Sequence, residues 1–326
     1  MRKARIKGVE RSYYHCVSRI VHRQFLMGAA EKEYFRRLMR RVEGFCDVRI
    51  LAYAIMDNHF HILLEVPESE PEIDDEELFR RMEFLYGGGR ISELAGEIGR
   101  RREAGRDDLA DSLKREYLYR MRDVSEFMKT LKQRFTQWYN HCSGLSGTLW
   151  ESRFKSVLIE NSENALSTIS AYIDLNPVRA GIVRDPKDYR FCSYAEAVAG
   201  GRRARESLLR IVRPDGPPAH PERELAVYRQ HLYISDKERS ISRESIRAVI
   251  EAGGELPVRD LLACRIRYFT DGIVLGSRQF VEDVYRANRG QFGVGRKSGA
   301  HRLRHGEWGG LCALRDLRRD PVTIPL

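Results

Sequence analysis

Two histidines one residue apart, His59 and His61, are the side chains of this chain best suited to bind a metal ion. Apolar runs at residues 50–55 and 62–64 flank them and are typical of a buried β-strand. Because alternate residues of a strand point to the same side of a sheet, a strand at this position projects both imidazoles from one surface. Two surface or hydrogen-bonded histidines are the alternative interpretation, which the spacing alone does not exclude.

Tyr172 and Asn176 form a second candidate group, four residues apart in a segment of helical character, so that a helix would place them on one face. A divalent cation held by two neutral imidazoles and an amide oxygen keeps positions open for the phosphate oxygens of a substrate. A tyrosine hydroxyl in line with the phosphorus can then act as the nucleophile and form a phosphotyrosine. A packed aromatic ring and a helix C-cap are the alternative, which these two residues taken alone favour.

The first 196 residues predict the elements that must position these groups. The expected strands lie at residues 11–22, 48–56, 59–66 and 148–160, and the expected helices at about 30–45, after Asp123 and after Asn161 or Ser162. The order β-α-β-β-α-β-α favours an α+β fold, a ferredoxin-like antiparallel sheet with helices on one face. We therefore expect residues 1–196 to form the catalytic domain.

The remaining segments divide by composition. Residues 68–123 are highly charged with helical periodicity and predict a helical insertion, whereas glycines and prolines in 197–236 indicate a linker. Residues 237–295 predict a small helical module, which is compatible with a helix-turn-helix DNA reader and with many other helical domains. Residues 296–326 form a basic tail, either a phosphate-binding arm or a solvated end.

The composition favours a polyanionic partner and excludes a membrane protein. The 326 residues carry a net charge of +10, which is a weak signal by itself. No run approaches the roughly 20 apolar residues of a membrane span, and no signal peptide is visible, so we expect a cytoplasmic, nucleoid-associated protein. The six cysteines are scattered without a Cys-x-x-Cys pair, which argues against a zinc knuckle or a disulfide framework.

Several basic side chains are candidates for DNA contact, with a solvated surface as the alternative. Arg153 and Lys155 belong to the expected strand at 148–160, and Lys129, Lys132 and Arg134 lie off the apolar stripe of the helix that follows Asp123. Two other groups are less favoured candidates. Tyr139 is a second possible nucleophile. Glu65 lies an even number of residues from both histidines, so a strand places it on the same face, where it could approach the ion.

Four runs of the sequence resemble a known family. The run from Met56 to Leu64 resembles the HUH motif of bacterial single-tyrosine, IS200-like transposases. The run from Tyr172 to Gly181 resembles the tyrosine helix of their relatives, the REP-associated tyrosine transposases, as do Trp150 to Phe154 and Asp185 to Tyr194. The resemblance covers about residues 8–67 and 124–196.

This resemblance implies a reaction and a set of roles. It implies that His59, His61 and Asn176 hold Mg²⁺ or Mn²⁺ and that Tyr172 is the nucleophile. The family cuts single-stranded DNA, often at the foot of a hairpin, forming a 5′-phosphotyrosine and freeing a 3′-hydroxyl. A monomer or a homodimer is expected, and asparagine in place of the more common glutamine favours the REP-associated branch.

Two other functions remain open at this point. One is a catalytically silent DNA-binding regulator derived from such a transposase, and the other is a metal-dependent phosphodiesterase that uses water as nucleophile. The sequence specifies neither the DNA target nor whether the active site is shared between subunits.

Overall fold

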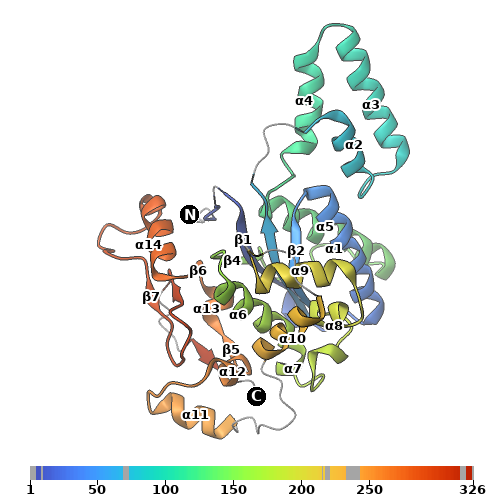
Figure 1. Ribbon diagram of the computed structural model, residues 1–326. Coiled ribbons are helices and arrows are strands. Elements are labelled where there is room, and N and C mark those ends of the chain that lie inside the picture. Colours follow the sequence, from blue (N-terminus) through green and yellow to red (C-terminus); the bar gives the residue numbers. More distant parts are fainter. Residues whose placement is uncertain are drawn as a thin grey trace.

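The structure is a computed structural model that describes residues 5–8, 10–68, 73–214, 216, 221–232, 243–315 and 321–324. Within these residues the chain is a mixed α+β protein, with a seven-stranded mixed sheet and many helices (Figure 1). In the part of the chain so described, no helix has the length and apolar character that a membrane span requires.

The first part of the chain has the predicted element order β-α-β-β-α-β-α. Its elements are β1 (Ser12–Arg19), α1 (Ala29–Cys46), β2 (Arg49–Ile55), β3 (His59–Val66), α5 (Val124–Ser143), β4 (Lys155–Ile159) and α6 (Glu163–Asp174). The predicted caps are confirmed. The Asp123 carboxylate accepts hydrogen bonds from the first turn of α5, and the Ser162 hydroxyl accepts one from the first turn of α6.

Four strands pair antiparallel in the order β2-β3-β1-β4, with His59 opposite Arg19 and His61 opposite Val17. The sheet then continues beyond the predicted edge. Strand β4 pairs in parallel with β6 (Val274–Gly276), and antiparallel pairing adds β8 (Cys312–Ala313) and β7 (His301–Arg302). The expected purely antiparallel sheet is therefore wrong, because a C-terminal strand joins it in parallel.

Helices cover both faces of the sheet, which corrects the expected coverage of one face. Helices α1 and α5 pack on the face that carries Phe60, Ile62 and Leu64. The opposite face, which carries Leu63, packs against α6 and three further helices. These are α8 (Ser193–Val198), α9 (Arg202–Val212) and α10 (Pro221–Leu232). Because both faces of the central strands are apolar, each face has to be shielded from water.

The predicted helical insertion is present in the described residues. It comprises α2 (Asp75–Met82), α3 (Gly88–Glu103) and α4 (Asp107–Leu118), which project away from the sheet in Figure 1. The expected linker at 197–236, in contrast, is largely helical. Helix α9 buries Leu208, Ile211 and Val212 against β2 and its neighbours, so the apolar stripe outweighs the flanking glycines and prolines.

The C-terminal region is more than the small helical module expected at 237–295. It contains the helices α11 (Arg243–Glu251), α12 (Val258–Leu262), α13 (Arg267–Asp271) and α14 (Arg278–Ala287). Strand β5 (Arg265–Ile266) lies among them and pairs with β9 (Val322–Thr323) in a second sheet. The short elements β7, β8 and β9 also place the described part of the basic tail on the folded body, whereas Arg318 and Arg319 lie outside the described residues.

Candidate active site

His59 and His61 lie on one face of β3, as their spacing predicts. Their rings stand edge to face with centroids 5.2 Å apart, and His61 is only 3% exposed. The strand carries them because most of its other residues are apolar and pack into the two cores on either side of the sheet. Burial lowers the pKa of His59 to about 3 and that of His61 well below its ordinary value, so both imidazoles are neutral at pH 7.

A hydrogen bond determines which ring nitrogen of His59 is free. Its Nδ1 lies 2.6 Å from the amide oxygen of Asn58, whose amide nitrogen donates to the carbonyl of Arg23 at 3.1 Å. Because this oxygen can only accept, His59 Nδ1 must carry the proton. The Nε2 atom of His59 is therefore an unprotonated nitrogen that can bind a cation.

His15 on β1 does the same for His61. The Nδ1 atom of His15 lies 2.7 Å from the carbonyl oxygen of Phe269 and so must donate its proton there. His15 Nε2 then accepts the proton of His61 Nδ1 at 2.9 Å, which leaves His61 Nε2 unprotonated. Burial lowers the pKa of His15 to about 4, so this neutral arrangement holds at pH 7. His15 did not emerge from the sequence, where its polar character in an apolar strand is the sole hint.

Tyr172 meets the histidines across the fold. Its ring stands edge-on to those of His61 and His15, with centroids 6.1 and 6.2 Å apart. The side chain is 2% exposed, and its hydroxyl makes no hydrogen bond to the part of the chain that the structure describes. The tertiary structure thus brings together two groups that are 111 residues apart in the sequence.

Asn176 fits both interpretations of its position, a helix C-cap and a metal ligand. Helix α6 ends at Asp174, and the short helix α7 (Asn176–Arg179) follows, so Tyr172 and Asn176 do not share one continuous helix as expected. The Asn176 amide nitrogen donates to the carbonyls of Tyr172 and Ile173 at 3.3 and 3.2 Å, which is the C-cap interpretation. This orientation leaves the amide oxygen with no hydrogen bond to the described residues, as a ligand atom requires.

The C-terminal region and α7 complete the surroundings of Tyr172. The Phe269 ring packs edge-on against the Tyr172 ring with centroids 5.0 Å apart. The Arg179 guanidinium lies 4.0 Å from the ring centroid and donates to the carbonyls of Tyr172 and Leu262 at 3.0 and 2.9 Å. Residues beyond 260 therefore hold both the tyrosine ring and the His15–His61 pair.

Three arginines make the site electropositive. The charges of Arg19, Arg179 and Arg265 all act on His59 and disfavour its protonation, after the larger effect of burial. Arg19 and Arg265 are half-buried, and neither forms a side-chain hydrogen bond or ion pair within the described residues, although Glu151 offsets part of the charge at Arg19. Unpaired guanidinium groups beside a tyrosine hydroxyl suit a phosphate-bearing substrate.

The residues present fit a divalent metal ion. The donors are two imidazole nitrogens and an amide oxygen, a set compatible with Mn²⁺, while Mg²⁺ prefers oxygen ligands more strongly. Among the described residues, no group of three His, Cys, Asp or Glu side chains is arranged to hold a metal. The Asn176 amide oxygen, which makes no hydrogen bond to the described residues, is a suitable further ligand beside His59 and His61.

Other candidate groups lie elsewhere or are engaged. Glu65 shares the face of the histidines but lies at the far end of β3, within 3.9 Å of Arg11, Arg49 and Arg210. Tyr139 lies on α5, which packs on the opposite face of the sheet.

The basic residues predicted on α5 have intramolecular partners. Lys129 pairs with Glu126 at 3.1 Å. Lys132 donates to the carbonyl of Ser152 at 2.9 Å, and burial lowers its pKa to about 8. Arg134 donates to the carbonyl of Leu85 at 3.2 Å. Their role in DNA contact stays a prediction.

The two basic residues predicted near β4 differ in whether they have an intramolecular partner. Lys155 is exposed and pairs with Asp271, whereas the exposed Arg153 side chain forms no hydrogen bond or ion pair with the described residues. Of these five cations, Arg153 is the one best placed to accept an external anion.

A buried carboxylate anchors the helix that carries Tyr172. Asp174 accepts hydrogen bonds from the Ser193 hydroxyl at 2.7 Å, the Tyr194 backbone at 3.0 Å and the Tyr228 hydroxyl at 2.7 Å. Burial raises the pKa of Asp174 to about 6, while these donors act in the opposite direction. The end of α6 is thereby tied to α8 and α10.

Replacing Tyr228 with phenylalanine is expected to lower the free energy of unfolding by about 1–2 kcal/mol, because one buried oxygen of Asp174 loses its donor. Urea unfolding followed by circular dichroism measures the change. Tyr119→Phe is the matched control, since Tyr119 is 58% exposed and should leave the stability unchanged. Equal midpoints for the two variants would contradict the anchoring role of Asp174.

Comparison with known proteins supports the resemblance seen in the sequence. The family model described as "Transposase IS200 like" matches residues 8–72, a segment that includes His15, His59 and His61 and ends before Tyr172 and Asn176. The predicted resemblance is confirmed for this segment. The chain is also similar to a solved structure entitled "Structure of the REP associates tyrosine transposase bound to a REP hairpin". The two share 17% identity, with a TM-score of 0.40 over 62% of this chain and 87% of that chain. No curated protein matches the chain.

Proposed function

We propose that this protein is a metal-dependent single-stranded DNA endonuclease and strand transferase of the transposase type. It cuts near hairpins through a covalent 5′-phosphotyrosine intermediate. The observation that carries the proposal is the meeting of the Tyr172 ring with the His15–His61 pair, beside unpaired arginines. The family match over residues 8–72 supports the same reaction class.

Each group has a role in the proposed reaction. Arg19 and Arg265 attract the phosphodiester, and the Tyr172 oxygen attacks its phosphorus. The bond from phosphorus to the tyrosine oxygen forms as the bond to the 3′ oxygen breaks. Water accepts the hydroxyl proton of tyrosine, and water supplies a proton to the leaving 3′ oxygen. The products are a 5′-phosphotyrosine and a free 3′-hydroxyl, whose later attack on the phosphotyrosine rejoins strands.

His59 Nε2, His61 Nε2 and Asn176 Oδ1 would hold Mg²⁺ or Mn²⁺. When bound, the ion withdraws charge from the phosphate oxygens and helps the P–O bond to break. The chain itself supplies the preorganisation. Asn58 and His15 hold the two imidazoles in the tautomer that a metal ion requires, so no proton has to be displaced when the ion binds.

The test is incubation of the full chain with Mn²⁺ and a DNA hairpin that carries single-stranded flanks. A protein–DNA adduct that survives denaturant is the expected result. Cleavage without an adduct would favour the phosphodiesterase that uses water. Binding with no cleavage would favour the silent regulator.

A further inference from the structure

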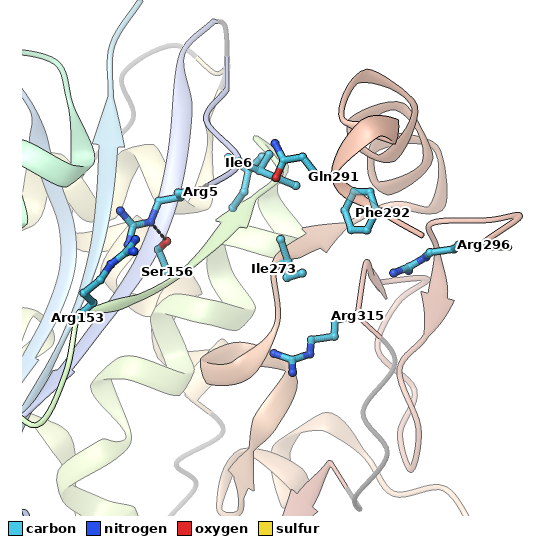
Figure 2. A pocket seen from close by; sticks show the side chains of 10 residues that line it. Arg5, Ile6, Arg153, Ser156, Ile273, Gln291, Phe292, Arg296 and Arg315 are labelled. Carbon is cyan, nitrogen blue, oxygen red and sulfur yellow. Dashed lines mark hydrogen bonds between the residues drawn. The ribbon is translucent and has the colours of Figure 1, made fainter. Parts of the chain in front are cut away.

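A cavity of about 510 Å³ lies between the N-terminal segment, β4 and the C-terminal region. Figure 2 shows Arg5 and Arg153 next to each other on one side of it, with Phe292 and Arg296 on the other. Ligand pockets typically measure about 300–1,000 Å³, so this cavity has room for a nucleotide.

The cavity is strongly cationic. Four of its ten lining residues are arginines, namely Arg5, Arg153, Arg296 and Arg315, and none of the ten is acidic. Burial lowers the pKa of Arg5, and the charge of the nearby Arg153 acts in the same direction. Like charges gathered in one cavity repel each other, and a bound anion relieves that repulsion. The arginine fork is also the side-chain group best matched to phosphate.

Two of these guanidinium groups are held rigidly. Arg5 donates to the hydroxyls of Ser156 and Ser125 at 2.6 and 2.8 Å. Its guanidinium carbon also lies 3.7 Å from the centroid of the Phe154 ring. Arg296 donates to the carbonyls of Ser298 and Gly299 at 2.9 and 3.0 Å. These bonds use only part of the five N–H groups of each guanidinium and fix the others in place. Fixed N–H groups lose little conformational entropy when they bind a ligand, which favours affinity.

The remaining cavity wall suits a nucleobase. Phe292 packs against the Tyr285 ring with centroids 5.3 Å apart, and Ile273 lies between it and the Arg5 side of the cavity (Figure 2). The Gln291 amide, which donates to the Asn288 side chain at 3.1 Å, also lines the cavity. An aromatic and aliphatic wall beside guanidinium groups is the combination that binds single-stranded nucleic acid with little sequence preference.

The cavity is separate from the candidate active site. Its lining residue Leu158 belongs to the core beneath α1 and α5, whereas the adjacent Val157 belongs to the core that contains Tyr172. Arg153, just before β4, lies at the end of the sheet where the nearby Glu151 backbone bonds to Arg19 at 2.9 Å. Arg19 and Arg153 therefore lie at the same end of the sheet, close enough for one DNA strand to contact both.

We infer that this cavity binds a nucleotide of the single-stranded DNA that flanks the cleavage site. Arg5 and Arg153 bind its phosphate, and Phe292 packs against its base. The identity of the ligand as DNA rests on the proposed function, whereas the site itself lies outside the catalytic residues.

The experiment measures binding of a fluorescent single-stranded oligonucleotide to the full chain without metal, over a range of salt concentrations. Arg153→Gln is expected to weaken binding about 3–10-fold and to lower the salt slope by about one. Arg202→Gln is the control. Arg202 is 88% exposed on α9, so this substitution removes the same charge at a site away from the cavity. Affinity and slope equal to those of the control would overturn the inference.

The contact between Phe292 and the base is tested by changing both the ligand and the protein. Abasic residues in the single-stranded flank are expected to weaken binding to the unmodified chain about tenfold. The Phe292→Leu variant is expected to bind the abasic oligonucleotide as tightly as the normal one. If the abasic ligand and the Phe292→Leu substitution weaken binding independently, so that their fold-losses multiply, the assignment of Phe292 is overturned. Competition by inorganic phosphate as strong as by unlabelled oligonucleotide would indicate a simple anion site and overturn the DNA assignment. None of these measurements needs cleavage, so their failure and the failure of the proposed reaction are distinguishable.

Discussion

The Tyr172→Phe variant is expected to form no covalent adduct with a hairpin oligonucleotide, a loss of at least about 10³-fold in the rate of attachment, because no other group replaces the nucleophile. The substitution removes a single oxygen. Because the ring is buried and its hydroxyl has no hydrogen-bond partner among the described residues, packing and stability should be unchanged. Binding of Mn²⁺ and of DNA should likewise be retained.

The measurement is a denaturing gel with the oligonucleotide labelled at its 3′ end, since the strand on the 5′-phosphate side of the cut stays attached to tyrosine. Tyr139→Phe is the matched control on α5 and should form the adduct at the rate of the unmodified chain. Cleavage that persists in Tyr172→Phe would contradict the proposed nucleophile. An adduct lost in Tyr139→Phe and kept in Tyr172→Phe would reassign it.

Replacing His15 with leucine is expected to weaken Mn²⁺ binding about 10–100-fold, which is the usual cost of losing the partner that orients a metal-binding histidine. Without His15, the Nδ1 atom of His61 has no acceptor at this position, and its ring is free to take the other tautomer or to rotate. Isothermal titration with Mn²⁺ in the absence of DNA measures the affinity directly, independently of any cleavage.

A conservative variant separates this role from simple packing. In His15→Gln, the amide oxygen can accept from His61 and the amide nitrogen can donate to the Phe269 carbonyl, so affinity should recover most of the way. His61→Ala sets the lower limit, because it removes a ligand. Equal losses of Mn²⁺ affinity in His15→Leu and His15→Gln would contradict the orienting role and show that His15 acts only as a packing residue.

Much of the first 196 residues could be predicted because the signals are local. Strand alternation, helix periodicity and the caps at Asp123 and Ser162 depend on residues within one or two turns of each other. The same is true of the two histidines on β3, whose common face follows from the geometry of any strand. The C-terminal strands could not be predicted, because β5 to β9 are only two or three residues long and carry no period.

By itself, the sequence determined which side chains are chemically suited to bind a metal ion or to act as a nucleophile, and which elements carry them. Only the tertiary structure decided that Tyr172 lies beside His61, that His15 selects the tautomer of His61, and that α7 and the C-terminal region enclose the site. The physical reason is the range of the contacts. The His15–Phe269 bond joins residues 254 positions apart, and it depends on strand register and on the docking of α13, neither of which leaves a periodic pattern in the chain.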